Sequence, residues 1–245
     1  MQGSNYIDRV SEVMHKAWDS QTETILDVAK KMANTIAKKN NVYVFGCSHA
    51  GIIAEEVFYR TGGLAILNPI FFPGFALNTR PITMTSKLER VPGIGRILVE
   101  EHKLKAGDML IVHSVSGRNT VPVEMVECAR AKGVYTVAIT SIAYSKSVTS
   151  RAPDGKRLFE VADTVIDNCG IPGDAAMNLE GLPEAIGPTS TAVGTALINA
   201  IVIETVENLI AMGIVPPVFM SANLDGGGEH NAKMFEEYAD NIFYM

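Results

Sequence analysis

Residues 108–132 read DMLIVHSVSGRNTVPVEMVECARAK: an apolar run, a polar loop and a helical pattern in direct succession. The run from Asp108 to Val112 shows no alternation of polar and apolar residues, which is typical of a strand buried on both faces of a parallel sheet. The pattern from Val121 to Lys132 predicts a helix. A buried strand that leads through a short loop into a helix is the repeating unit of an α/β fold.

The same succession recurs along the chain. Further strands are expected over residues 42–45, 64–67, 135–140 and 164–167, and further helices over 50–60, 94–102 and 189–212. Residues 5–39 have helical spacing, and Ser20 with Glu23 fits a capping box that would begin a second helix. We therefore predict a doubly wound α/β fold with a parallel sheet. The simplest division is an N-terminal helical extension, residues 1–40, followed by one domain, residues 41–245.

Composition narrows the class of protein. The 245 residues carry a formal net charge of −6, which disfavours binding of a nucleic-acid backbone as the main role. Cys47, Cys128 and Cys169 are widely spaced, so neither a disulfide framework nor a zinc site is indicated. The N-terminus lacks an apolar signal core, and the apolar segment 192–203 is too short to cross a bilayer. We expect a cytoplasmic protein without a membrane partner.

The loop after the 108–112 strand has the composition of an anion site. Ser114 and Ser116 place two hydroxyls two residues apart, and Gly117 allows a close approach of the backbone. Asn119 and Thr120 precede a helix whose free N–H groups favour a phosphate. The same residues could instead serve only as helix caps.

Two other polar loops follow predicted strands. Residues 46–51 read GCSHAG after the first strand, and Thr140-Ser141 follows the strand 135–140. Open α/β sheets bind ligands at the carboxyl ends of their strands, so these loops are expected to meet at one edge. Neither GxGxxG nor GxxxxGK[ST] occurs, so the motifs do not indicate a dinucleotide or a P-loop site.

The sequence resembles a known family, the sugar isomerase (SIS) domain. The resemblance is carried by Ser114-x-Ser116-Gly117-x-Asn119, the following ECARAKG, and the strand ending at Ser141. It extends over about residues 40–210, and residues 54–64, 187–191 and 225–231 resemble stand-alone SIS-domain proteins. The resemblance implies a flavodoxin-like sheet, a homodimer or homotetramer, and a phosphorylated sugar as ligand. Since no cofactor or metal motif occurs in the sequence, we expect neither a cofactor nor a metal.

The resemblance also implies roles for particular residues. Ser114, Ser116 and Asn119 would bind the phosphate with Gly117, and Ser48 and Ser141 would lie beside them. The family commonly has Ser or Thr at the position of Asn119, but an asparagine amide can still donate to phosphate.

Candidate acids and bases lie elsewhere in the chain. Phosphoheptose isomerases resemble this sequence in carrying a glutamate on the helix after the first loop, where this chain has Glu55 and Glu56. Those enzymes also use a histidine on the last long helix, where this chain has none. His49 and His230 are therefore the candidates for a proton shuttle, and strand alternation predicts a structural role for His113. The residues His49, Glu56 and His230 lack the spacing typical of a metal site.

These observations predict a phosphosugar-binding protein. The first hypothesis is an aldose–ketose isomerase that works by acid–base proton transfer from Glu and His. A lyase or etherase acting on an amino-sugar phosphate could use the same residues. The alternative from another class is a phosphosugar sensor without catalysis.

Overall fold

The computed structural model describes residues 1–245 as a five-stranded parallel sheet between two layers of helices. The strands are β1 (Val42–Gly46), β2 (Leu67–Pro69), β3 (Met109–His113), β4 (Tyr135–Thr140) and β5 (Thr164–Asp167). Their order is β2-β1-β3-β4-β5, the flavodoxin-like arrangement. The predicted doubly wound α/β class is confirmed.

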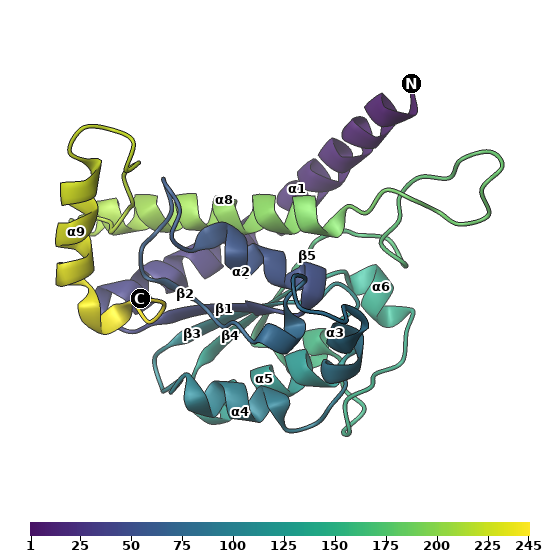
Figure 1. Cartoon of the computed structure of the whole chain (residues 1–245), viewed down its shortest axis with the longest axis horizontal. Helices are drawn as coiled ribbons and strands as arrows, with labels where there is room; N and C mark the ends of the chain where they lie inside the picture. Colours follow the sequence, from purple (N-terminus) through teal and green to yellow (C-terminus); the bar gives the residue numbers. More distant parts are fainter.

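Helices cover both faces of the sheet (Figure 1). One face carries α1 (Gln2–Ala37), α2 (Ile52–Val57) and α8 (Ser190–Ala211), and the other carries α4 (Ile94–Glu101) and α5 (Thr120–Ala131). Shorter helices are α3 (Thr83–Leu88), α6 (Ile142–Lys146) and α7 (Leu158–Val161), and α9 (Gly227–Glu237) lies near the C-terminus. Each face has its own apolar core, because every strand residue from Val42 to Phe45 is buried.

Helix α1 is continuous, so the prediction of a second helix beginning at Ser20 is wrong. Its apolar stripe runs without interruption through Ala17 and Ile25, both fully buried in the core shared with α8. The Ser20 hydroxyl points back to the Ala17 carbonyl at 3.5 Å and caps nothing. The division of the chain at residue 40 stays a prediction about domain organisation.

Two boundaries near β1 differ from the predictions. The strand expected over 64–67 begins instead at Leu67, because Leu64 forms an antiparallel bridge with Val218. The helix expected over 50–60 is divided into a 3-10 turn over 48–51 and the short α2. Phe58 is extended, with φ −94° and ψ 150°, so the helical path ends after Val57, and Tyr59 follows with φ 43°.

Helix α8 is longer than the apolar segment recognised in the sequence. Its 22 residues are long and apolar enough, by length and composition alone, to cross a membrane. In the fold it lies along α1 and α2, with Val193, Leu197 and Ile201 buried. Its buried side therefore belongs to the core of one face of the sheet.

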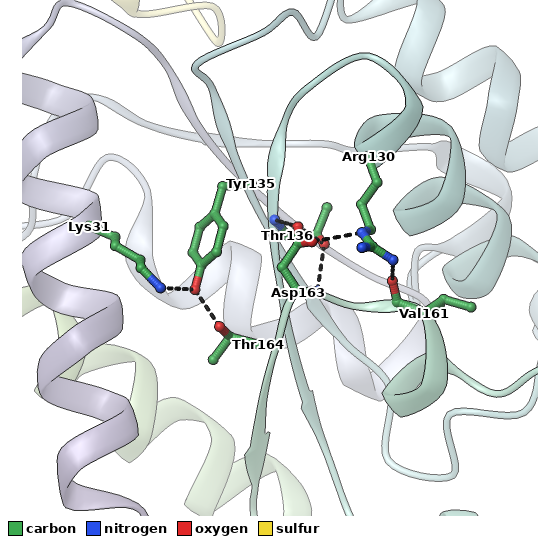
Figure 2. Close-up of polar contacts among 7 residues, drawn as sticks. All are labelled: Lys31, Arg130, Tyr135, Thr136, Val161, Asp163 and Thr164. Carbon is green, nitrogen blue, oxygen red and sulfur yellow. Dashed lines mark hydrogen bonds and ion pairs between the residues drawn. The ribbon is translucent and has the colours of Figure 1, made fainter.

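A polar network fixes the amino ends of β4 and β5 (Figure 2). The Asp163 carboxylate accepts from the backbone N–H of Thr136 at 2.9 Å, from its hydroxyl at 2.8 Å and from Arg130 Nε at 2.7 Å. On the other side, Lys31 of α1 donates to the Tyr135 hydroxyl at 3.0 Å. These contacts hold the edge strand in register with its neighbour.

Truncation of the core face of α8 tests this packing. We expect Ile201→Ala to lower the free energy of unfolding by about 2–5 kcal/mol, because the side chain is fully buried and leaves a cavity. Glu207→Ala, on the exposed side of the same helix, is the control and should change stability by less than about 0.5 kcal/mol. Urea unfolding measures both, and equal effects would contradict the placement of Ile201.

Candidate functional site

The chain reverses its direction of travel across the sheet at the carboxyl ends of β1 and β3. From β1 it crosses outward to β2 and then returns to β3 on the other side of β1. Gly46 pairs with His113, so the loops that follow these two residues leave the sheet side by side. This topological switch point is where open α/β sheets hold their ligands.

The loop after β1 is packed tightly. A Cβ on Gly46 would lie 2.3 Å from the Ala50 carbonyl oxygen, so no larger residue fits there. Ser48 adopts the left-handed conformation with φ 57° and is only partly buried. The turn thereby presents the Ser48 side chain at the edge of the sheet.

A cleft of about 590 Å³ lies beside this loop. Ser48 and Glu55 both line it, one from the loop and one from α2. The opposite wall comes from the segment 70–79 and is mainly aromatic and apolar; its members are Ile70, Phe71, Phe72, Pro73, Phe75, Ala76, Asn78 and Thr79. The cleft therefore combines the Ser48 hydroxyl and the Glu55 carboxylate with a mainly apolar wall.

The two adjacent glutamates of α2 have different surroundings. Glu55 is exposed and lines the cleft. Glu56 is turned toward α8, where Oε1 accepts from Asn199 Nδ2 at 3.0 Å, and it also forms an ion pair with Arg60. Only Glu55 is left free to meet a molecule in the cleft.

The loop after β3 keeps its serine hydroxyls free. Backbone bonds hold the loop: Ser114 N donates to Ile139 O at 3.1 Å, and Ser141 N donates to Val115 O at 3.0 Å. Ser114 is nearly buried and Ser116 partly exposed, and the loop's hydrogen bonds do not use either hydroxyl. These hydroxyls remain available to a ligand.

Gly117 is required by close packing. Its φ is 58°, and a Cβ would lie 3.0 Å from Ser145 Oγ and 3.1 Å from Thr140 Oγ1. The Gly117 carbonyl also accepts from Leu158 N at 2.8 Å. The glycine lets the loop curl against β4 while Ser116 stays at the surface.

Asn119 and Ser141 are engaged within the protein. Asn119 stands at the N-cap of α5 without a capping side-chain bond, and its Oδ1 accepts from Arg151 Nη1 at 2.8 Å. Ser141 is fully buried; its hydroxyl donates to Gly170 O at 2.5 Å and accepts from Tyr144 N at 3.1 Å, capping α6. The Ser141 side chain therefore caps a helix, and the Asn119 side chain does not. Contact of either side chain with a ligand stays a prediction.

The candidate histidines lie in different places. His49 is exposed on the same turn as Ser48. His230 belongs to α9, where its Nε2 lies 3.0 Å from the Val218 carbonyl oxygen. Figure 1 places α9 beside the C-terminal end of α8, whereas Gly194, near the N-terminal end of α8, lies against His113 at the end of β3, so α9 lies away from the switch point of its own chain. No cluster of three or more His, Cys, Asp or Glu side chains is suited to a metal.

The chain is similar to known proteins in sequence and in fold. A family model described as SIS domain matches residues 5–141. The chain is 48% identical over 240 residues to a UPF0309 protein of Shouchella clausii, with 98% of each chain covered. It is 36% identical over 240 residues to a UPF0309 protein of Streptomyces coelicolor, covering 98% of this chain and 96% of the relative.

The chain belongs to the SIS domain family. Two solved structures share the fold of this SIS protein. A phosphoheptose isomerase from Neisseria gonorrhoeae has a TM-score of 0.51 at 16% identity, covering 82% of this chain and 95% of that one. The sugar isomerase domain of an RpiR transcription factor from Sphaerobacter thermophilus has a TM-score of 0.50 at 14% identity, covering 97% and 98%. At these identities the likeness concerns the fold alone.

His113 ties the two loops of the SIS domain to α8. Its ring is fully buried, with Nδ1 3.0 Å from the Ala50 carbonyl oxygen, while Nε2 has no hydrogen-bond partner. Gly194 of α8 lies against the ring, since a Cβ there would be 3.1 Å from Cε1. Burial lowers the pKa of His113 below its ordinary value, although Ala50 and Asp174 act to raise it. The ring is a neutral structural link, as strand alternation predicted.

Sequence reasoning missed two residues that contact this part of the SIS domain. Arg151 holds the Asn119 amide, and Glu89 lies near both Asn119 and Cys47. Burial raises the pKa of the Glu89 carboxyl, while the hydrogen bond from Asn119 acts to lower it. Both residues lie in irregular segments outside any periodic pattern, so only the folded chain brings them to the site.

Substitution of Gly117 tests the close packing of the loop. Gly155→Ala is the matched control, because Gly155 has φ 76° with open space around it and should cost only about 1–2 kcal/mol for the left-handed backbone. We expect Gly117→Ala to lower the free energy of unfolding by more than this, because its Cβ also crowds Ser145 and Thr140. Chemical denaturation measures both, and equal losses would argue against the close approach.

The buried ring predicts a pH dependence of stability. Because the pKa of His113 is lowered in the folded state, the unfolded chain binds its proton more readily, and stability falls as pH drops through about 6.5. Between pH 7.5 and 5.5, the free energy of unfolding should fall by about 1 kcal/mol more in the wild-type protein than in His113→Gln. Urea unfolding of both proteins at both pH values measures this difference. The same pH dependence in His113→Gln as in the wild type would contradict a neutral His113.

Proposed function

We propose that this SIS protein is an enzyme that acts on a phosphorylated sugar, namely an aldose–ketose isomerase. The observation that carries the proposal is the cleft at the switch point. It presents the Glu55 carboxylate and the Ser48 hydroxyl beside the loop with the free hydroxyls of Ser114 and Ser116. The SIS family and the fold shared with a phosphoheptose isomerase support it.

The proposed reaction needs only proton transfers. The Glu55 carboxylate takes the proton from the carbon next to the sugar carbonyl, and the electrons of that C–H bond form an enediolate. Glu55 then returns the proton to the former carbonyl carbon. His49, on the same turn as Ser48, moves the hydroxyl proton between the two oxygens. No oxidant or cofactor is consumed.

Binding and chemistry are assigned to different parts of the site. Ser114, Ser116 and the backbone at Gly117 hold the phosphate, so that the carbonyl end of the sugar extends into the cleft toward Glu55. The aromatic and apolar wall over 70–79 excludes water from the enediolate. Ser114, Ser116 and the backbone at Gly117 contribute equally to binding of the ground state and of the transition state, and therefore govern mainly KM.

We propose further that the protein is a cytoplasmic homo-oligomer. Exposed apolar side chains gather on the distal part of α8 and the following turn; they are Ile203, Ile210, Met212 and Val215. Such a patch favours burial against a second copy. His230 would reach a phosphosugar only in that neighbouring copy. The free state of the cysteines is compatible with a reducing compartment.

Glu55→Gln tests the assignment of the base. We expect kcat for the sugar phosphate that is isomerised to fall by a factor of about 100 or more with little change in binding, because the amide cannot accept the carbon-bound proton. Glu56→Gln is the adjacent control and should lose less than about tenfold, because Glu56 contacts α8 and not the cleft. NMR in D2O follows turnover and deuterium incorporation at the carbon next to the carbonyl.

The outcomes separate the candidate functions. Loss of turnover in Glu56→Gln alone would move the base to Glu56. Binding of a sugar phosphate without isomerisation or deuterium exchange would favour a sensor. Exchange accompanied by loss of a substituent would favour the lyase or etherase reaction on an amino-sugar phosphate. Absence of binding across pentose, hexose, heptose and N-acetylamino sugar phosphates would refute a phosphosugar site.

A further inference from the structure

Three arginine side chains beside the phosphate loop have no ion-pair partner. Arg118 lies within the loop after β3, Arg90 follows α3, and Arg151 lies in the connection between α6 and α7. None of the three has a carboxylate oxygen within 4.0 Å. The arginines that form ion pairs are Arg9, Arg60, Arg130 and Arg157.

Hydrogen bonds bring these three segments to the same place. Arg151 N donates to Arg118 O at 2.7 Å, so the two residues are neighbours through their backbones. Val121 N donates to Glu89 O at 3.0 Å, which places Arg90, the next residue, beside the start of α5. The cluster is therefore assembled from parts of the chain about 30 residues apart, on the side of the loop where Asn119 lies.

The charges of the cluster are not balanced. Desolvation lowers the pKa of Arg151, and the guanidinium groups of Arg118 and Arg90 lower it further by repulsion. The Glu89 carboxyl acts to raise the pKa of Arg151, but burial weakens the ionisation of Glu89 by raising its own pKa. Arg118 Nη2 donates to the Thr149 hydroxyl at 3.2 Å, but its buried Nε has no partner. In a chain with a net charge of −6, this concentration of positive charge calls for an anion.

We propose that Arg90, Arg118 and Arg151 form the cationic half of the phosphate site and make it selective for a doubly charged phosphoryl group. The inference rests on the proposed function and adds to it. Serine hydroxyls and backbone N–H groups are neutral, so on their own they do not offset the two charges of a phosphate monoester. Guanidinium groups are positively charged and offset these charges. Two N–H groups of one guanidinium can also donate to two oxygens of the same phosphate.

Methyl phosphate and methyl sulfate are suitable probes, because they have nearly the same shape but carry two charges and one at pH 8.0. We expect the wild-type protein to bind methyl phosphate more tightly than methyl sulfate. Arg151→Gln and Arg90→Gln should each raise the Kd for methyl phosphate about tenfold or more and should narrow the preference over methyl sulfate. Arg9→Gln, which removes an arginine from an exposed ion pair on α1, is the control and should change neither.

Thermal unfolding without ligand distinguishes binding from a structural role. Removing one of three mutually repelling cations should leave the Tm unchanged or raise it. A lower Tm for Arg151→Gln together with unaltered methyl phosphate binding would make Arg151 a support for Asn119 and overturn the inference. So would failure of the wild-type protein to bind methyl phosphate, or equal affinity for the two probes.

The inference and the proposed function can fail separately. If a sugar phosphate is isomerised and its affinity is the same in Arg151→Gln as in the wild type, the function stands and the arginine site does not. If methyl phosphate binds in an arginine-dependent way but no sugar phosphate binds, the anion site stands and the isomerase assignment fails.

Discussion

Five consecutive residue pairs join β1 to β3, from Val42 opposite Met109 to Gly46 opposite His113. This pairing places the two polar loops next to each other. Because β2 lies on the outer side of β1, the chain leaves the two strands in opposite directions, and the space between the loops stays open. The cleft beside Ser48 and the free hydroxyls after β3 both depend on this register. A shift of one strand by one residue would turn its side chains to the opposite face of the sheet and break this alignment of the loops.

On the side of the sheet that carries α8, three glycines let backbone segments pack closely and hold the two loops in place. Gly46 and Gly51 allow the β1 turn to fold back on itself, and Gly194 allows α8 to lie against the His113 ring. The ring in turn holds the Ala50 carbonyl. A buried imidazole with one free nitrogen is costly, so its presence there is consistent with a role in positioning two loops and a helix at once.

The strands and the polar loops could be predicted from sequence because their signals are local. Continuous apolar runs mark β1, β3 and β4, and Ser114 with Ser116 follows one of them directly. The separation of Glu55 from Glu56 could not be predicted, because it depends on where Asn199 of α8 lies. The strand β2 begins three residues later than the sequence predicts for a similar reason, because Leu64 forms a bridge with Val218. Long-range partners decided each of these differences.

The serine motif of the loop after β3 does not by itself offset the charge of a phosphate. The motif accounts for hydrogen bonds to phosphate oxygens but brings no net charge, and the cleft adds a carboxylate, which repels an anion. Positive charge on the far side of the loop from Glu55 therefore strengthens the binding of a phosphorylated ligand. Arg118 and Arg151 lie beside Asn119 at the start of α5, away from the α2 wall of the cleft. In the proposed site, the arginines attract the phosphate from one side of the loop, while the Glu55 carboxylate lines the cleft on the other side.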